Sequence, residues 1–323
     1  MPEVNLVQAL NRALRDALSD DPRTLVLGED VGRNGGVFRV TEGLQQEFGE
    51  ERVFDTPLAE SAIAGISVGL ALAGWHPVAE MQFDGFSYPA LDQVISHVAK
   101  YRSRSRGRMP VPMVIRIPTG GGIGGPEHHS ESPDVLYAHT AGLKVVAPSG
   151  ALDAYNLLLR SIADPDPVIF LEPKGRYWSR EAGELSAGGL PIGRARVSRL
   201  GEHCTLIAWG ASVARCLEAA EAAAEDGVSL EVVDVRSLVP LDEETILASV
   251  RKTGRAVVVH EAPMTGGFGA EIVARIMERG FRDLLAPVLR VTGYDIAYPP
   301  ATLENVQLPS MDRILLAVQK TFG

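Results

Sequence analysis

Short apolar segments alternate with amphipathic segments along this chain, and the alternation restricts its fold more than any other feature. In the first half, strands are predicted at residues 24–27, 77–81, 111–117, 143–146 and 168–171, with helices at 5–18, 62–73, 89–101 and 151–162 between them. Residues 5–18, for example, place leucine and alanine at the three- and four-residue spacing of one helix face. Strands joined by helices pair in parallel and are covered on both faces, so the sequence predicts an α/β fold with a mainly parallel sheet.

The alternation stops between residues 172 and 201, where proline, glycine, arginine and serine predominate. It then resumes with predicted strands at 205–209, 230–235, 256–259 and 288–291, and with helices at 213–225, 243–250, 269–279 and 311–320. A chain of 323 residues is also long for one core and suits two domains. We therefore predict a first α/β domain over residues 1–185, a linker over 186–201 and a smaller α/β domain over 202–323.

Composition argues against several classes of partner. The net charge of -10 disfavours nucleic acid or an anionic membrane, which both attract basic surfaces. The apolar run from Ala62 to Trp75 is too short and too interrupted to span a bilayer. Cys204 and Cys216 have neither zinc-site spacing nor a disulfide framework, and we expect both thiols to be buried, one on a strand and one on a helix. The start of the chain has no signal-peptide pattern, and a cytoplasmic location is predicted.

One carboxylate stands in front of the most apolar helix of the chain. The segment 55–60, Asp-Thr-Pro-Leu-Ala-Glu, precedes an alanine- and glycine-rich run, and Pro57 suits a first helical turn. Glu60 would then lie at the N-terminus of a buried helix, where apolar surroundings raise the pKa of a carboxyl group and let it share a proton with a ligand nitrogen. The alternative is that Glu60 only interacts favourably with the helix dipole.

A glycine run follows one of the predicted strands. Gly120–Gly125 contains the spacing G-x-G-x-x-G, but prolines bracket the run, no helix begins at its end and no acidic residue follows about twenty positions later. These departures argue against a dinucleotide-binding motif. The next helix is predicted with Ser132 as its N-cap and Pro133 as its first residue. We interpret the glycines as a flexible loop that delivers His128 and His129 to a site, with a structural role for either histidine as the alternative.

Four motifs, in order along the chain, resemble one family of enzyme subunits. They are Leu27–Val31, Asp55–Glu60, Glu80–Phe86 and His128–Pro133. Together they are similar to the β subunit of the thiamine-diphosphate-dependent decarboxylase component of 2-oxo acid dehydrogenase complexes, over nearly the whole chain. The resemblance implies a parallel-sheet pyrimidine-type thiamine-binding domain, followed by a smaller transketolase-type C-terminal α/β domain.

The resemblance also implies roles for individual residues. Glu60 matches the catalytic carboxylate that hydrogen-bonds the aminopyrimidine ring of thiamine diphosphate. His129 matches the catalytic histidine, which donates a proton or stabilises charge during acyl transfer. Leu58, Phe86 and Glu29 match cofactor-binding positions, which support the bent cofactor, stack on its pyrimidine and add a second acidic group. The residues themselves leave alternatives open, since Phe86 could belong to the core and Glu29 could cap a helix or form an ion pair.

A structural potassium site is a further implication of the resemblance. Family members hold this ion through main-chain and side-chain oxygens at positions that correspond here to Met113, Ser161, Ile162, Asp164 and Asp166. Asp166 stands where many relatives have asparagine, and so adds negative charge. The acidic segment 164–167 could instead be a solvated turn.

The diphosphate side of a thiamine site is missing from the sequence. The chain contains no Gly-Asp-Gly segment followed by asparagine, by which thiamine enzymes hold the diphosphate through Mg2+. The resemblance therefore implies an α subunit that supplies the Mg2+ and diphosphate site in an α2β2 enzyme. It also implies a lipoyl acyltransferase core that receives the acyl group.

The substrate is predicted to be a branched-chain 2-oxo acid. Phe83–Phe86, Gly124–Pro133 and Tyr298–Pro300 look more like branched-chain enzymes of the 3-methyl-2-oxobutanoate type, which act in branched-chain amino acid catabolism, than like pyruvate enzymes. The alternatives within the family are a pyruvate or an acetoin dehydrogenase β subunit. Outside it, a non-catalytic scaffold is disfavoured by the intact motif residues, and a nucleotide-binding oxidoreductase by the context of the glycine run.

Overall fold

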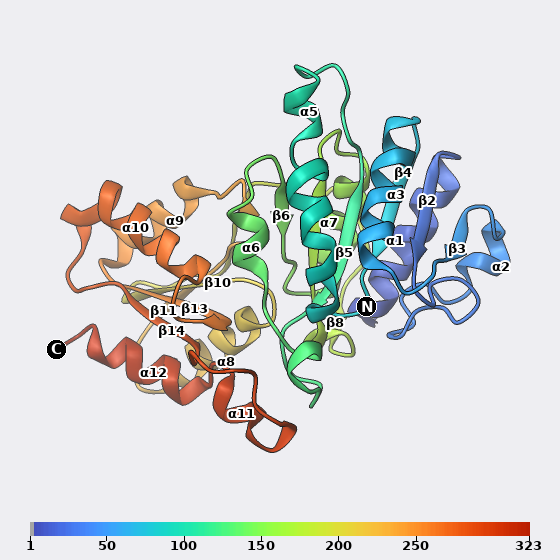
Figure 1. Cartoon of the computed structure of the whole chain (residues 1–323). Helices are drawn as coiled ribbons and strands as arrows, with labels where there is room; N and C mark the ends of the chain where they lie inside the picture. Colours follow the sequence, from blue (N-terminus) through green and yellow to red (C-terminus); the bar gives the residue numbers. More distant parts are fainter. Residues whose placement is uncertain (1–2) are drawn as a thin grey trace.

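The computed structural model describes residues 3–323, which form two α/β units lying side by side (Figure 1). The strands of the larger sheet are β2 (Thr24–Gly28), β3 (Val53–Asp55), β4 (His76–Glu80), β5 (Val114–Thr119), β6 (Lys144–Val146), β7 (Val168–Pro173) and β12 (Ser237–Val239). Those of the smaller sheet are β9 (Arg196–Arg199), β10 (Cys204–Ala208), β11 (Leu230–Asp234), β13 (Ala256–Pro263) and β14 (Leu289–Gly293). A short antiparallel ribbon pairs β1 (Glu3–Asn5) with β8 (Arg180–Ala182).

Both sheets are parallel apart from one edge strand each. The order of strands is β12-β6-β7-β5-β4-β2-β3 in the larger sheet and β14-β13-β10-β11-β9 in the smaller one, with β12 and β9 antiparallel to their neighbours. The predicted α/β fold with mainly parallel sheets is therefore confirmed. The division at 185 and 202 stays a prediction, because β12 follows the predicted boundary yet completes the larger sheet, and β9 lies inside the predicted linker.

Helices cover both faces of each sheet (Figure 1). The longer ones are α1 (Leu6–Asp20), α3 (Glu60–Leu72), α7 (Ala151–Ile162), α8 (Ser212–Glu225), α9 (Glu243–Thr253), α10 (Phe268–Gly280) and α12 (Met311–Lys320). The shorter ones are α2 (Leu44–Phe48), α4 (Leu91–Gln93), α5 (Tyr101–Arg104), α6 (Asp134–Ala138) and α11 (Glu304–Gln307). Single turns are η1 (Gly85–Ala90), η2 (Val94–Val98), η3 (Glu127–His129), η4 (Lys174–Arg176), η5 (Phe281–Asp283) and η6 (Ala301–Leu303). Within residues 3–323, no helix combines the length and apolar character that crossing a bilayer requires.

The sequence sets the start of α1 through a capping box. The Asn5 side chain accepts the N–H of Gln8 at 2.9 Å, and the Gln8 side chain accepts the N–H of Asn5 at 3.0 Å. The buried face of α1, including Leu10 and Leu14, then packs with α7 against the larger sheet. Local hydrogen bonding and the helical spacing of apolar residues therefore act together here.

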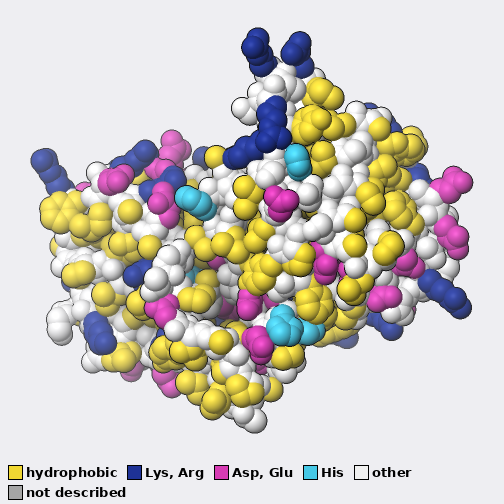
Figure 2. All heavy atoms as spheres, in the orientation of Figure 1, with side chains coloured by type: hydrophobic (Ala, Val, Ile, Leu, Met, Phe, Trp, Pro, Cys, Tyr) yellow, Lys and Arg dark blue, Asp and Glu magenta, His cyan; other side chains and the backbone are white. Residues whose placement is uncertain are grey.

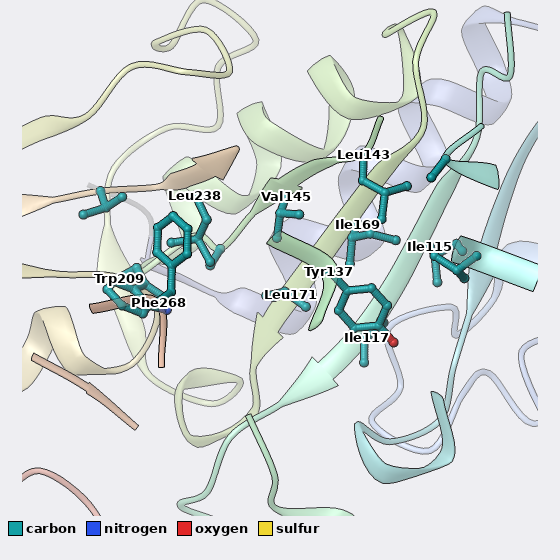
Figure 3. Packing of buried hydrophobic residues seen from close by; sticks show 14 of the residues in the cluster. Ile115, Ile117, Tyr137, Leu143, Val145, Ile169, Leu171, Trp209, Leu238 and Phe268 are labelled. Carbon is teal, nitrogen blue, oxygen red and sulfur yellow. The ribbon is translucent and has the colours of Figure 1, made fainter. Parts of the chain in front are cut away.

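One hydrophobic cluster continues from the larger unit into the smaller one. Figure 3 shows its members from both units: Ile115, Ile117, Tyr137, Leu143, Val145, Ile169, Leu171, Trp209, Leu238 and Phe268. Burial of such side chains contributes about 1.5–3 kcal/mol each, so the two units are held together by apolar packing. Cys204 on β10 and Cys216 on α8 are buried thiols, as predicted.

The prediction of a single helix at 89–101 is wrong. The structure instead contains the end of η1, α4, the π-helical turn η2 and the start of α5. Pro89 lies within η1 and lacks an N–H, and the π turn closes where the N–H of Ala99 donates to the carbonyl of Val94 at 3.0 Å. The strand predicted from residue 111 begins at Val114, because the two prolines before it cannot donate to a sheet.

Two predicted helix starts are shifted in the structure. α3 begins at Glu60, so Pro57 lies before the helix rather than in its first turn. α6 begins at Asp134, whose own carboxylate accepts the N–H of Val135 at 2.7 Å. Ser132 is therefore not the N-cap, and the prediction placed this helix one residue too early.

A fully buried arginine joins three neighbouring strands at the centre of the larger sheet. Arg116 on β5 donates to Glu172 on β7 at 2.6 and 3.0 Å and to Glu80 on β4 at 2.5 Å. The Tyr177 hydroxyl also donates to Glu172, at 2.5 Å. All four side chains are buried, so each charge depends on its partners for stabilisation.

Replacing this arginine should destabilise the fold strongly. Arg116→Met leaves two buried carboxylates without a cation and should lower the free energy of unfolding by about 3–5 kcal/mol. Urea denaturation followed by circular dichroism measures the change. Arg12→Met is the matched control, because Arg12 is exposed and pairs with Asp16 one helical turn away, a pair worth less than about 0.5 kcal/mol. Equal small changes in both variants would contradict a structural role for the buried cluster.

Candidate active site

Four segments of the sequence meet at one edge of the larger sheet. The carboxyl ends of β5, β4, β2 and β3 are neighbours, so the residues that follow these strands lie in a row. Glu29 follows β2, Glu60 begins α3 after β3, Phe86 follows β4, and Gly120–Gly125 with His129 follow β5. The structure therefore brings together the residues that the four motifs had singled out.

Glu29 has a strongly perturbed pKa at this edge. Its side chain is 5% exposed, and neither carboxylate oxygen makes a hydrogen bond within the described residues. Burial raises the pKa of Glu29 to about 7, and the charges of Glu60 and Asp30 act in the same direction; the backbone N–H of Ala59, which is near but outside hydrogen-bond geometry, opposes them. Glu60 is half-buried as the first residue of α3. The sequence predicted Glu29 only as a second acidic group and did not indicate that its pKa lies near neutrality.

Aromatic rings surround the second predicted catalytic residue. The ring of His129 lies with its centroid 4.3 Å from that of Phe83 and 5.0 Å from that of Phe86. Its Nδ1 atom is buried and has no hydrogen-bond partner among residues 3–323. Burial lowers the pKa of His129, and the charges of His128 and Lys174 add to this effect. His129 is therefore mainly neutral at pH 7.

The other predicted cofactor residues are accessible from the same edge. Phe86 is half-buried, with an edge-to-face contact to Phe83 at 5.6 Å, and so does not belong to the closed core. Leu58, between β3 and α3, is 78% exposed. Single exposed leucines are common, so the exposure of Leu58 permits a ligand contact without indicating one.

A buried ion pair that the sequence analysis missed supports the aromatic cluster. Lys174 contacts the carboxylate of Asp84, and both side chains are fully buried. Asp84 also accepts the N–H of Gly85 at 2.8 Å, and Lys174 lies 5.7 Å from the centre of the Phe83 ring. Burial raises the pKa of Asp84 to about 6, although the nearby charge of Lys174 lowers it. The signal in the sequence was one charged residue directly after the end of β7 and another four positions after the end of β4.

Two carboxylates of the smaller unit hold the glycine loop, Gly120–Gly125. The N–H of Gly121 donates to Glu261 at 3.1 Å, and those of Gly122 and Gly124 donate to Glu304 at 2.9 and 3.1 Å. The sequence predicted a flexible loop, whereas the structure shows one anchored across the two units. Both carboxylates lie far along the chain, so no local pattern indicated them.

The anchoring contacts also explain why this segment is rich in glycine. Gly120 and Gly122 have φ of +79° and +94°, which other residues rarely adopt. A Cβ atom on Gly121 would come within 1.9 Å of the Tyr298 hydroxyl, which itself donates to Glu304 at 2.9 Å. The glycines are therefore required by close packing as well as by backbone conformation.

The acidic side chains of the predicted potassium site are occupied by cations of the chain itself. Lys144 lies 2.6 Å from Asp164 and 3.5 Å from Asp166, and Arg102 lies 2.5 Å from Asp166. Arg102 belongs to a group of basic side chains gathered over α5 and the following loop, at the top of Figure 2. These carboxylates therefore do not fit a potassium ion as side-chain ligands.

The main-chain part of the potassium prediction is untested. The carbonyl of Met113 accepts the N–H of Val168 at 3.0 Å, and that of Ser161 accepts the N–H of Asp164 at 3.4 Å. A carbonyl oxygen has a second lone pair, so Met113, Ser161 and Ile162 stay predicted ligands through their carbonyls alone. In the described part of the chain, no group of three or more His, Cys, Asp or Glu side chains is arranged to hold a metal ion.

Comparison with known proteins gives the class to which this fold and site belong. Residues 2–178 match the family "Transketolase, pyrimidine binding domain", and residues 193–314 match "Transketolase, C-terminal domain". The fold is similar to that of a solved chain described as "Split gene transketolase, inactive beta4 tetramer", with a TM-score of 0.80, 23% identity and coverage of 98% of both chains. The chain is therefore a transketolase-type protein with a pyrimidine-binding unit and a C-terminal unit.

Relatives in sequence narrow this class to one family. The chain is 56% identical to the 3-methyl-2-oxobutanoate dehydrogenase subunit beta of Mycobacterium tuberculosis (strain ATCC 25618 / H37Rv), over 98% of this chain and 91% of the relative. It is 52% identical to the pyruvate dehydrogenase E1 component subunit beta of Leifsonia xyli subsp. xyli, over 98% of this chain and 94% of the relative. The chain belongs to the E1 β subunits of 2-oxo acid dehydrogenases, which confirms the predicted family. Membership implies the use of thiamine diphosphate and an α subunit as partner.

The raised pKa of Glu29 should make stability depend on pH. The pKa of Glu29 is about 7 in the folded chain, against an ordinary value of 4.5. The protonated form therefore stabilises the fold fully below pH 4.5, and this stabilisation is lost as the pH rises through about 7. Glu29→Gln cannot ionise, and it should be more stable than the parent chain by about 1–3 kcal/mol at alkaline pH and equally stable at acid pH. Urea unfolding of the isolated chain across this pH range measures the difference.

The control for this experiment is an exposed carboxyl group. Glu127→Gln, whose parent side chain is 54% exposed, should show no gain in stability that grows with pH. A constant difference between Glu29→Gln and the parent at every pH would contradict the raised pKa.

Proposed function

We propose that this chain is the β subunit of a branched-chain 2-oxo acid dehydrogenase of the 3-methyl-2-oxobutanoate type. Together with an α subunit in an α2β2 enzyme, it decarboxylates a 2-oxo acid and transfers the acyl group to a lipoyl group of the acyltransferase core. The observation that carries this proposal is the row of Glu29, Glu60, Phe86 and His129 along one sheet edge, in a chain 56% identical to a 3-methyl-2-oxobutanoate dehydrogenase β subunit.

The residues at this edge fit the pyrimidine half of thiamine diphosphate. A buried carboxyl group with a pKa near neutrality, such as Glu29, can hold a proton against a ring nitrogen, and its oxygens make no hydrogen bond within residues 3–323. Phe86 offers a half-buried ring for stacking, and Leu58 offers an exposed apolar side chain. When bound, thiamine diphosphate supplies the carbanion chemistry that decarboxylation of a 2-oxo acid requires.

We assign the catalytic carboxyl role to Glu60, with Glu29 as its neighbour. Burial, with the nearby charge of Glu60, raises the pKa of Glu29 to about 7, so Glu29 holds a proton more readily than an ordinary carboxyl group. Glu29 can therefore keep a proton available beside Glu60 at neutral pH. The half-buried position of Glu60 leaves it accessible to a ligand.

We assign proton transfer during acyl transfer to His129. Its Nδ1 atom is the buried nitrogen, so Nε2 is the atom available to a substrate. The lowered pKa favours the neutral ring, which can accept a proton and then return it. The contacts with Phe83 and Phe86 hold the ring in one orientation.

The α subunit is proposed to supply Mg2+ and the diphosphate site, because the sequence lacks the motif for them. A structural potassium ion is retained as a proposal only through main-chain carbonyls. A pyruvate dehydrogenase β subunit is the second candidate function, favoured by the 52% identity to the Leifsonia xyli protein. We propose a cytoplasmic location for the complex.

Steady-state kinetics of the assembled α and β chains test the proposed substrate preference. We expect kcat/KM for 3-methyl-2-oxobutanoate to exceed that for pyruvate by at least about tenfold, because the additional methyl groups contribute roughly 1–3 kcal/mol in an apolar pocket. Steady-state decarboxylation with each substrate gives the ratio. A ratio in favour of pyruvate would make the second candidate correct.

The isolated chain is the control for the shared site. Calorimetric titration of the chain alone with thiamine diphosphate should show no binding that depends on Mg2+, and addition of the α subunit should create it. Tight, Mg2+-dependent binding by the chain alone would contradict a site divided between two subunits.

The adjacent histidines provide a matched pair of variants. His129→Ala should lower lipoyl-dependent turnover by roughly two to four orders of magnitude, as expected for a positioned proton donor. His128→Ala should have a much smaller effect, because the His128 side chain is 58% exposed. Cofactor affinity should change little in either variant. Equal and mild losses, or unfolding of the His129 variant, would indicate a structural histidine instead.

A further inference from the structure

A cavity between the two units is surrounded by arginine side chains. It has a volume of about 430 Å³ and lies between η4, β8, β9 and the starts of α7 and α8. Arg176, Arg180 and Arg196 line this arginine cavity, together with one carboxylate, Glu181. Its lining is therefore positively charged, in a chain whose net charge is -10.

Three hydrogen-bond donors at the arginine cavity are buried and have no acceptor among residues 3–323. They are Nε of Arg176, Nε of Arg196 and Oγ of Ser198. Buried donors in folded proteins are nearly always hydrogen-bonded. Because water cannot reach these three atoms, a ligand in the cavity would meet the outer guanidinium nitrogens of the lining arginines instead.

Arg176, unlike the other two arginines, has no ion-pair partner within residues 3–323. Arg196 pairs with the buried Asp234 at 2.8 Å, and Arg180 pairs with Glu3 at 3.5 Å on the surface. No carboxylate of the described chain forms an ion pair with Arg176. Burial lowers the pKa of its guanidinium, and the more distant charges of Glu218 and Glu181 oppose this effect. An anion in the cavity would compensate this charge.

The single carboxylate of the lining already has a partner. Glu181 accepts the N–H of Leu152 at 3.1 Å and so provides a hydrogen-bond acceptor for a backbone N–H in the first turn of α7. The beginning of α8, at Val213 and Ala214, also faces the cavity. Its backbone dipole adds to the attraction for an anion.

We propose that the arginine cavity binds a phosphorylated small molecule. A phosphate group presents several oxygens, which the guanidinium groups of Arg176, Arg180 and Arg196 around the cavity can bind. The volume of about 430 Å³ is in the range of cavities that hold a small organic ligand, so a phosphate monoester fits it.

The turn η4 connects the arginine cavity with the candidate active site. Lys174 pairs with Asp84 below the aromatic cluster, and the next residue, Gly175, packs so closely on the glycine loop that a Cβ would lie 3.0 Å from the carbonyl oxygen of Gly121. Arg176 then reaches the cavity. A ligand that orders Arg176 should therefore also affect the glycine loop. This second step depends on the proposed function, whereas the binding of the phosphate does not.

Calorimetry on the assembled α and β chains tests the binding. The enzyme is first loaded with thiamine diphosphate and Mg2+, so that the diphosphate site is filled, and free cofactor is removed by gel filtration. It is then titrated with inorganic phosphate, with adenosine monophosphate and with adenosine as the uncharged control. We expect saturable binding of the two phosphates, one site per β chain, and no binding of adenosine. The isolated chain should bind the same two phosphates.

Variants locate this binding. Arg176→Met should weaken the binding of both phosphates at least about tenfold. Arg176→Lys should restore only part of the affinity, because lysine keeps the charge but lacks the planar pair of N–H donors of a guanidinium. Arg196→Met should also weaken binding, and thermal unfolding shows whether each variant is folded. Arg12→Met, at an exposed arginine on α1, should bind as the parent does.

Three results would overturn the proposal. The first is no saturable binding of either phosphate at millimolar concentration, in the assembled enzyme or the isolated chain. The second is unchanged affinity in the Arg176 and Arg196 variants, which would place the ligand elsewhere. The third is phosphate binding by the isolated chain that disappears in the assembled enzyme. That result would show that an acceptor side chain of the partner subunit fills the arginine cavity. Since binding is measured rather than turnover, these results stay interpretable even if the proposed substrate is wrong.

Discussion

The buried ion pair between Lys174 and Asp84 is the interaction on which the candidate site depends. It joins the end of β7 to the turn after β4, across the strand between them, and Lys174 also donates to the carbonyl of Pro118 on that strand at 3.4 Å. Either charge alone at this depth would be destabilising by several kcal/mol, roughly 3–5 for a broken buried pair. Three strand ends are thereby fixed relative to one another, and the rings of Phe83 and His129 pack on this frame.

The smaller unit contributes to the same edge through backbone hydrogen bonds. Glu261 and Glu304 accept three N–H groups of the glycine loop, which carries the chain from β5 to His129. The shared apolar core keeps the two units in contact, so these carboxylates stay opposite the loop. The position of His129 thus depends on packing between units as well as on its own neighbours. A purely local description of the site would miss this contribution.

Sequence patterns predicted those features that depend on neighbouring residues. Strand and helix alternation gave the α/β fold, and the motifs around Glu29, Glu60 and His129 gave the residues that meet at the sheet edge. Features that depend on distant residues were missed: the pairing of β12 with the larger sheet, the Arg116 cluster, and the anchoring of the glycine loop from the smaller unit. The failed helix at 89–101 has a local cause instead: Pro89 lacks an N–H, and the backbone changes from 3-10 to α to π geometry although the side-chain spacing is helical.

The distribution of charge at the sheet edge supports the proposed division of the cofactor site between two subunits. Glu29 and Glu60 repel each other at the sheet edge, and Asp30 adds to the effect. Such an edge favours a group that can share a proton, as an aminopyrimidine does, and disfavours a diphosphate. The positive lining of the arginine cavity lies on the other side of η4, behind the buried Lys174. The turn η4 therefore lies between the carboxylates of the edge and Arg176, which has no ion pair within the described residues. This distribution supports the proposal that a second subunit supplies the positive charge for the diphosphate.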